Sequence, residues 1–132
     1  MAEKKIICDT DVMIDYWDET NARHKETKFI LENDIGLDNV VLTAITKLEL
    51  LAGAINKKEI DKIDRKLNRF NITLLNNHIT IKAFELMLNY RCSHGLALPD
   101  CLIAATAMIF DLQFFTYNKK DFKFIADIKF YN

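Results

Sequence analysis

Short runs of apolar residues alternate along this chain with longer stretches in which apolar side chains recur every three or four positions. The short runs predict buried strands, and the three-or-four spacing predicts helices with one apolar face. The predicted strands cover 5–9, 40–43, 72–75, 113–116 and 128–131. The predicted helices cover 12–17, 22–33, 45–55, 60–70, 79–90 and 101–110, with a short helix at 121–125.

The alternation of strands and helices predicts the fold class. Crossover connections between such strands give a mainly parallel sheet, so we expect a three-layer α/β/α fold with about five short strands. The 132 residues, half of them hydrophobic, predict a single domain over 1–132. Ligand sites in such sheets gather at the carboxyl ends of the strands. Asp9 and the segments after Thr43 and Thr116 should therefore converge.

Composition limits the classes of partner and the compartment. Eighteen basic and nineteen acidic residues give a net charge of −1, so any contact with nucleic acid must be local. The three cysteines, without CxxC spacing, predict reduced core thiols, which are typical of the cytosol. We find neither a signal-peptide core nor the roughly 18 apolar residues of a membrane span. We expect a soluble, cytoplasmic protein with no membrane partner.

Two acidic residues lie where the first predicted strand ends. Asp9 closes the apolar run KIICD, at a strand tip where ligands bind in parallel sheets. Asp11 follows at the turn into a helix, and its ordinary interpretation is a helix N-cap, a position that Asp favours. Asp9 is therefore the stronger candidate for chemistry.

Three further acids are candidates, and each also has a structural explanation. The inner face of the predicted helix at 45–55 is the apolar stripe Ile45, Leu48, Ala52 and Ile55. Glu49 lies beside this stripe, either facing inward or reaching solvent at the border of the helix. Asp100 follows Pro99 in a first helical turn, where the helix dipole alone favours an acid. Asp121, with Asn118 three residues earlier, can act as a cap of the short helix.

Grouping Asp9, Glu49, Asp100 and Asp121 would bring like charges together, and these raise one another's pKa unless a cation lies between them. Carboxylate oxygens without a nearby Cys or His cluster favour Mg²⁺, with Mn²⁺ as a substitute. Such an ion suits hydrolysis of a phosphodiester by a metal-activated water. The acids thus predict a metal-dependent hydrolase.

Four segments, in order and over nearly the whole chain, resemble the motifs of the PIN-domain family, and within it the VapC-like toxins. They are IICDTDVMID, LTAITKLELLAG, LALPDCLIAATA and FFTYNKKDF. The resemblance implies metal-binding roles for Asp9, Glu49 and Asp100, with Thr46 preceding Glu49. Many members carry a fourth acid where this chain has Asn118, and Asp121 is a candidate substitute.

The same resemblance implies what the protein does and with what it associates. It implies an α/β/α PIN fold and Mg²⁺-dependent cleavage of RNA. It also implies homodimerisation and inhibition by a cognate antitoxin of a type II toxin–antitoxin pair. Neither composition nor periodicity indicates these properties.

Basic residues offer two candidate contacts to RNA phosphates. The first set flanks the last motif: Lys119, Lys120 and Lys123. The second is a helical stripe, Lys58, Lys62, Arg65 and Arg69, but interleaved acids favour a solvated, salt-paired face there. His24, His78 and His94 lack metal-ligand spacing and are expected in surface or capping roles. Tyr16 and Trp17 are expected to pack rather than to stack on bases.

Two other functions are compatible with the sequence. A PIN-like RNA-binding module with weakened activity is suggested by Asn118. A haloacid-dehalogenase-like phosphatase would use Asp9 of DTDV as nucleophile and Asp11 as acid and base. That family also requires a later adjacent pair of acids, whereas Asp121 and Asp127 are well separated.

Overall fold

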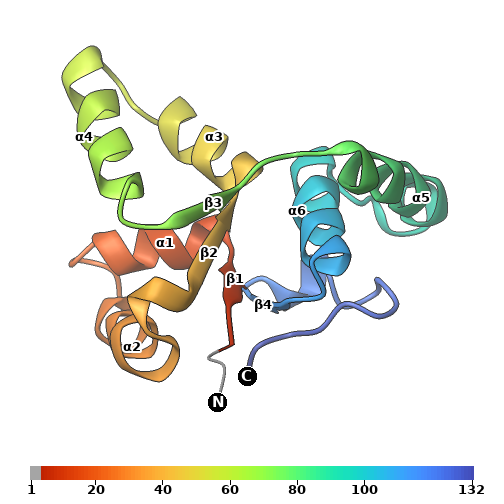
Figure 1. The fold of residues 1–132 in the computed structure, drawn as a ribbon, viewed down its shortest axis with the longest axis horizontal. Helices are drawn as coiled ribbons and strands as arrows, with labels where there is room; N and C mark the ends of the chain where they lie inside the picture. The colour runs from red at the N-terminus through yellow and green to blue at the C-terminus, as the bar shows by residue number, and fades with distance from the viewer. Residues whose placement is uncertain (1–3) are drawn as a thin grey trace.

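The computed structural model describes residues 4–132 and contains a four-stranded parallel sheet. Its strands are β1 (Ile6–Cys8), β2 (Val40–Thr43), β3 (Asn71–Thr73) and β4 (Gln113–Phe115), in the order β3-β2-β1-β4. Ile7 pairs with Val41 on one side and with Phe114 on the other. All strand connections in the described chain are therefore crossovers, as the alternating pattern predicts (Figure 1).

Helices fill both faces of this sheet. They are α1 (Thr10–Trp17), α2 (His24–Phe29), α3 (Ala44–Ala52), α4 (Lys57–Leu67), α5 (Asn77–His94) and α6 (Leu98–Ile109). Shorter turns are the π-helix η1 (Ile30–Ile35) and the 3₁₀ helices η2 (Leu37–Asn39) and η3 (Lys119–Asp121). Asn56 and Asn76 cap α4 and α5, and Gly95 ends α5 in the left-handed conformation with φ of 68°.

The sheet separates two apolar cores because successive strand residues point to opposite faces. Ile7, Val41 and Phe114 pack with α5 and α6 on one face. The other face carries Ile6 and Cys8 of β1 among the apolar residues that pack with α1, η1 and the end of α4. The expected three-layer α/β/α arrangement is confirmed, and Figure 1 shows α5 and α6 together on the side of the sheet away from α1 and α2.

Several element boundaries differ from the pattern. The expected strand at 128–131 is reduced to a single parallel bridge between Phe114 and Phe130. A left-handed residue, Asp127, turns the chain immediately before this segment, which leaves room for only local pairing. The short helix expected at 121–125 is instead the 3₁₀ turn η3, which ends at Asp121.

The expected inner face of the helix at 45–55 is wrong in part. The helix ends at Ala52, Leu48 is 59% exposed and Ile55 is 82% exposed. The fully buried residue of α3 is Thr46, because the helix begins at the capping residue Thr43 and turns that side toward α1. An apolar stripe therefore did not identify the buried face here.

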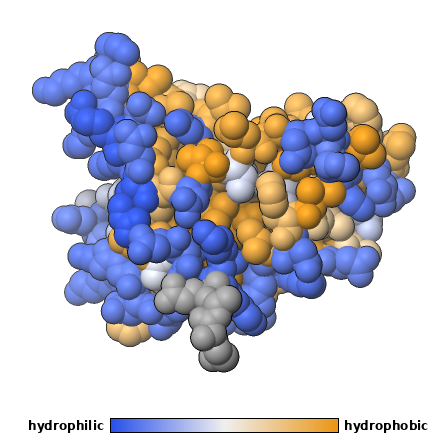
Figure 2. All heavy atoms as spheres, in the orientation of Figure 1, coloured by the Kyte–Doolittle hydropathy of each residue, from blue (hydrophilic) through white to orange (hydrophobic). Residues whose placement is uncertain are grey.

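A broad apolar surface remains exposed. Figure 2 shows apolar side chains along the upper and right parts of the molecule, over the region of α3, α5 and α6 in Figure 1. The large exposed apolar residues of these elements and of the segment before α5 are Leu48, Leu74, Leu75, Ile81, Phe84, Leu88 and Leu98. We call Ile81, Phe84 and Leu88 the outer stripe of α5. No helix within residues 4–132 is long and apolar enough to cross a membrane.

Candidate acidic active site

Asp9 lies directly after β1, at the carboxyl edge of the sheet. Its backbone N–H donates to Phe115 of β4, and its carboxylate caps α1 by accepting from the Thr10 N–H at 2.8 Å. Thr116, which follows β4, donates its hydroxyl to Oδ2 of Asp9 at 2.8 Å. The side chain is only 7% exposed. Two neighbouring strands thus orient this acid, in agreement with the predicted convergence.

The pKa of Asp9 is raised to about 6, first by burial and then by the charge of Asp11, with a smaller contribution from Glu49. The hydrogen bonds from Thr116 and Thr10 act in the opposite direction because they favour the charged carboxylate. The site therefore carries a carboxylate that is destabilised by its neighbours.

Asp11 has a different role from the expected N-cap. The cap of α1 is Asp9, and Asp11 lies within the first turn of the helix. Its Oδ2 accepts from the Tyr117 N–H and from the Asn118 side-chain amide, each at 3.1 Å. Its Oδ1 is buried without a hydrogen-bond partner among residues 4–132. Asp11 thus ties α1 to the segment after β4, and burial raises its pKa.

Glu49 reaches the same edge from α3. Its Oε1 accepts from the Thr10 hydroxyl at 2.7 Å, and this hydroxyl also lies 3.0 Å from the Thr46 hydroxyl. Thr46 is buried, and its N–H donates to the capping Thr43 at the end of β2. Glu49 itself is exposed, so of its two sequence interpretations the structure supports a side chain that reaches solvent while contacting the site.

Asp100 enters from the first turn of α6 and is half-buried. The pKa of Asp100 is raised to about 6, first by burial and then by the charges of Asp9, Asp121 and Glu49, in that order. This electrostatic coupling places the four acids in one neighbourhood. The carboxyl edge of the sheet therefore brings together Asp9, which follows β1, and the acids of α3, α6 and η3.

The last motif is arranged around Thr116. The Asn118 N–H donates to the Thr116 hydroxyl oxygen at 3.0 Å, and the Asp121 N–H donates to the Asn118 carbonyl at 3.0 Å. Asp121 is exposed at the end of η3. Asn118 is thus hydrogen-bonded to Asp11. Asp121 is the residue of this segment whose negative charge acts on Asp100.

The three lysines of the last motif do not behave alike. Lys119 donates to the Asn132 side chain at 2.7 Å and lies over the Phe130 ring, so it is engaged with the end of the described chain. Lys120 lines a cavity together with Asp100 and Asp121. Lys123 is exposed. Lys120 is the lysine of this group that lies beside the acids.

The donor set is suited to a hard divalent cation. Its oxygens come from carboxylates, and burial followed by mutual repulsion raises the pKa of Asp9 and of Asp100. As these side chains stand, no three acidic, His or Cys residues within 4–132 surround a common point. Mg²⁺ fits such a site because it commonly binds through one or two carboxylates and keeps several waters.

The sequence matches a known protein family over nearly its whole length. The model of the PIN domain matches residues 6–128, which is nearly the whole chain. The chain belongs to the PIN-domain family. PIN domains are typically nucleases, and those nucleases generally use a divalent metal. The phosphatase alternative is therefore wrong, and the resemblance of the four motifs is confirmed as family membership.

Solved structures agree with the PIN fold, and the neighbours are VapC/FitB toxins of toxin–antitoxin complexes. A toxin–antitoxin complex from Klebsiella pneumoniae matches with 29% identity and a TM-score of 0.74, covering 94% of this chain and 95% of that chain. FitAcB from Neisseria gonorrhoeae matches with 27% identity and a TM-score of 0.72, covering 96% of each chain. A comparison with curated protein sequences finds no match.

A more distant neighbour shares the fold alone. It is a VapC toxin of Mycobacterium tuberculosis described as cleaving the sarcin-ricin loop, with 15% identity and a TM-score of 0.64. The alignment covers 83% of this chain and 85% of that chain.

The PIN site also contains residues that the sequence did not single out. Thr10 links Asp9 to Glu49, and Thr116 links Asp9 to Asn118. Arg23 lies over the Tyr117 ring at 4.1 Å and pairs with the buried Asp15 at 2.7 Å. A hydroxyl residue within two positions of each strand end was the available signal for Thr10 and Thr116. No comparable signal marked Arg23.

The other residues weighed from the sequence lie outside the PIN site. Tyr16 and Trp17 pack against Phe70, as expected. Beside the basic stripe, Lys57 of α4 pairs with Asp61. Arg69, which follows α4, pairs with Asp38, and this supports the salt-paired interpretation for that member of the stripe. Of the cysteines, Cys8 and Cys101 are buried but Cys92 is exposed, so the expectation of three core thiols is wrong for Cys92.

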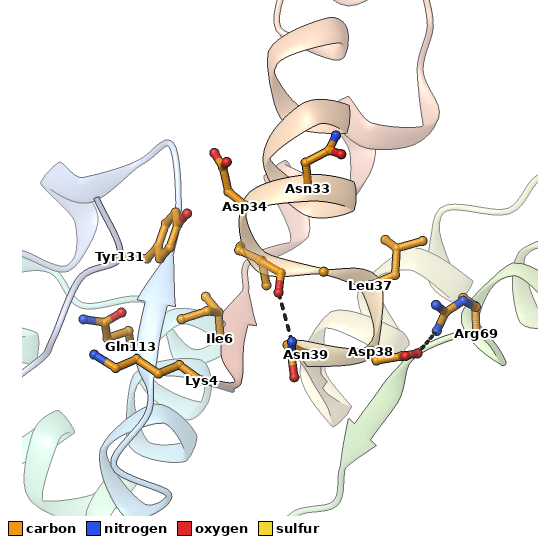
Figure 3. Close-up of a pocket in the computed structure, with 12 residues that line it drawn as sticks. Lys4, Ile6, Asn33, Asp34, Leu37, Asp38, Asn39, Arg69, Gln113 and Tyr131 are labelled. Atoms are coloured by element: carbon orange, nitrogen blue, oxygen red, sulfur yellow. Dashed lines mark hydrogen bonds and ion pairs between the residues drawn. The ribbon is translucent and has the colours of Figure 1, made fainter. Parts of the chain in front are cut away.

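Another cavity lies at the opposite edge of the sheet from the acids. It has a volume of about 480 Å³ and is lined by Ile6 and Gln113, which begin β1 and β4, and by the η1–η2 turn. Figure 3 shows the Asp38–Arg69 ion pair and the hydrogen bond from Asn39 to the Ile35 carbonyl on its wall. This cavity is not the candidate active site, because the acids lie at the other ends of the strands.

Proposed function

We propose that this protein is a Mg²⁺-dependent endoribonuclease and the toxin of a VapBC-type toxin–antitoxin pair. The observation that carries the proposal is the meeting of Asp9, Glu49 and Asp100, from three different elements, at the carboxyl edge of a PIN sheet. Repulsion among these acids favours a bound cation, and PIN domains are typically nucleases. Mn²⁺ is expected to substitute for Mg²⁺.

Asp9, Asp100 and Glu49 would hold the metal. When bound, Mg²⁺ activates a water and stabilises the charge that develops on the scissile phosphate. Thr116 and Thr10 fix the orientation of Asp9, and Thr46 supports Glu49 through Thr10. This support is important because groups behind the ligands set both the geometry and the affinity of a metal site.

Two residues, Asn118 and Asp121, lie where many PIN domains have a fourth acid. Asn118 donates its amide N–H to Asp11 and retains a neutral amide oxygen. Asp121 contributes the negative charge close to Asp100. We infer that Asp121 takes the place of the acid that many PIN domains carry at the position of Asn118.

The proposed partners are RNA, an antitoxin protein and a second copy of this chain. Lys120 and Lys123 are the candidate contacts to RNA phosphates, whereas the bonds of Lys119 to the end of the chain make it a weaker candidate. Solved neighbours in toxin–antitoxin complexes support the antitoxin. The outer stripe of α5 supports the homodimer, since an exposed apolar face of this kind is typical of an interaction surface.

The competing proposal is a PIN domain that binds RNA with weakened cleavage. Its motivating observation is Asn118 at the position of the fourth acid. The two proposals share the fold and differ in one measurable property, which is metal-dependent turnover of RNA.

The test is cleavage of total cellular RNA by purified, antitoxin-free protein with Mg²⁺ or Mn²⁺, beside EDTA. Asp9→Asn is the informative variant because Asn also caps helices well and should preserve α1. Asp111→Asn is the matched control, since Asp111 is exposed and pairs only with Lys129 at the surface among the described residues. Discrete fragments from wild type and Asp111→Asn, absent with EDTA and with Asp9→Asn, are expected. A folded wild-type protein that cleaves no RNA with either metal would favour the binding module.

A further inference from the structure

A second cavity adjoins the acids. It has a volume of about 260 Å³ and lies between the α5–α6 junction and the segment after β4. Asp100 and Asp121 form part of its wall, and so does Lys120. Whatever occupies this cavity is therefore a direct neighbour of the group that reacts at the acids. Its volume falls below the roughly 300–1,000 Å³ of pockets for drug-sized ligands, which indicates a small occupant rather than a large ligand.

Part of the wall of this cavity is aromatic. The rings of His94 and Phe124 are stacked, with centroids 4.4 Å apart and an interplanar angle of 8°. Both residues line the cavity. His94 is exposed and Phe124 is half-buried, so His94 is the ring that an incoming group can reach.

This aromatic wall is held in place from two sides. Tyr90 packs edge-on against His94 at 6.0 Å and in a tilted arrangement against Phe124 at 5.5 Å. Its hydroxyl accepts the Ala126 N–H at 3.1 Å. The Ser93 hydroxyl lies 2.7 Å from Nδ1 of His94. A ring that is already ordered loses little entropy when another ring stacks on it.

Aromatic rings, a lysine and acids line this cavity, and together they suit the base and the phosphates of a nucleotide. Aromatic rings stack on the face of any base, and a lysine ammonium contacts a phosphate. Asp100 and Asp121, which also line the cavity, belong to the candidate metal site. A chain of RNA whose scissile phosphate lies at those acids would place a flanking base close to the aromatic wall.

We propose that the cavity between His94 and Asp100 is a nucleobase subsite. In it the base of the nucleotide beside the scissile phosphate stacks on His94, backed by Phe124, while Lys120 contacts an RNA phosphate. This inference rests on the proposed ribonuclease function and adds the part of the substrate that the PIN acids do not recognise, namely the base.

The test compares binding of two single strands that differ only in their bases. One is a ten-nucleotide oligoadenylate, and the other has the same sugar-phosphate backbone without bases. Affinities are measured by fluorescence anisotropy with Ca²⁺ in place of Mg²⁺, and the strands are checked afterwards on a gel for intact length. Wild type should bind the oligoadenylate about tenfold more tightly, the effect expected for one stacked base.

The decisive variant is His94→Ala. It should lose the preference for the oligoadenylate while its affinity for the strand without bases stays unchanged. His94→Trp should keep the preference because it keeps a ring. The matched control is His78→Ala, which removes an exposed histidine at the other end of the same helix and should behave as wild type.

Lys120→Ala tests the phosphate contact separately. It should weaken binding of both strands equally and reduce the slope of log K against log salt by about 0.7, the value for one phosphate contact on a single strand. Lys25→Ala, on α2, is the control for removal of one exposed lysine.

Two results would overturn the subsite: a base preference that survives in His94→Ala, or a loss of affinity by that variant for both strands alike. The outcome is separate from that of the nuclease proposal. RNA cleavage by a wild type without base preference refutes only the subsite. A base preference that depends on His94, in a protein that cleaves no RNA, refutes only the nuclease and leaves the subsite supported.

Discussion

The Thr116 hydroxyl donates to Oδ2 of Asp9 at 2.8 Å and joins two residues that are 107 positions apart. The contact exists because β1 and β4 are parallel neighbours, so that the residues following them emerge at the same edge. It is also one of two hydrogen bonds that hold the pKa of Asp9 below the value that burial and repulsion alone would produce. The threonine therefore acts on the metal site through the carboxylate.

We expect Thr116→Val to weaken binding of Mg²⁺ by about 10- to 100-fold, the usual effect of removing support behind a metal ligand. Valine keeps the shape of threonine but leaves the charged form of Asp9 without this donor. Titration calorimetry with Mg²⁺ and Mn²⁺ measures the change. The control is Thr106→Val, since Thr106 is equally buried but bonds only within α6, to the Leu102 carbonyl. Equal metal affinity in wild type and Thr116→Val would contradict the role of this contact.

The stability of the metal-free protein should fall as the pH rises through about 6. The pKa values of Asp9 and Asp100 are raised from 3.8 to about 6 in the folded protein, so the folded state binds protons more tightly in this window. Their contribution is fully present below pH 3.8 and is lost above about pH 6. After a discount for the half-exposed Asp100, we expect a loss of about 1–2 kcal/mol between pH 5 and 7.5.

Urea unfolding in EDTA at these two pH values measures this loss. Asp9→Asn should flatten the dependence because an amide does not titrate. Mg²⁺ added at pH 7.5 should restore stability to wild type more than to Asp9→Asn, since a ligand that binds only the folded state stabilises it. A free energy of unfolding that does not change with pH in EDTA would show that the two acids are not coupled in this way.

The sequence predicted the strands and the acids better than the buried helix faces. Asp9 was identifiable because it ends a short apolar run, and parallel neighbours then bring it to Thr116. The capping role expected for Asp11 was wrong because α1 begins at Thr10, two residues earlier than its apolar residues indicate. Leu48 and Ile55 were expected inside, but a helical stripe does not distinguish a core face from a face left exposed for a partner. The link from Thr10 to Glu49 depends on the placement of α3 against α1, which no local pattern encodes.

Asn118→Asp tests the fourth position of the site. The new carboxylate would face Oδ2 of Asp11, from which the present amide lies 3.1 Å away, so two negative oxygens would replace a hydrogen bond. We expect the free energy of unfolding in EDTA to fall by about 1–3 kcal/mol and the affinity for Mn²⁺ to rise. Thermal unfolding and calorimetry measure the two effects.

Asp121→Asn separates the two candidates for that position. If Asp121 substitutes for the missing acid, this variant should bind Mn²⁺ more weakly than wild type, and the loss should be smaller when Asn118→Asp is also present. The difference is the coupling energy of a double-mutant cycle. Losses that simply add would mean that Asp121 and position 118 act independently, and no loss in either background would remove Asp121 from the site.

The proposed homodimer should depend on the outer stripe of α5. This helix has two apolar sides, since Ile79 and Leu86 are buried in the core while Phe84 and Leu88 are exposed. Burial of one such side chain contributes about 1.5–3 kcal/mol. A charge in its place should therefore weaken association by about tenfold to a hundredfold. Phe84→Asp should therefore elute as a monomer in size-exclusion chromatography with light scattering at concentrations where wild type is a dimer. Phe29→Asp, which changes an equally large exposed ring on α2, should remain dimeric. If Phe84→Asp stays dimeric or wild type is a monomer, α5 does not form the interface.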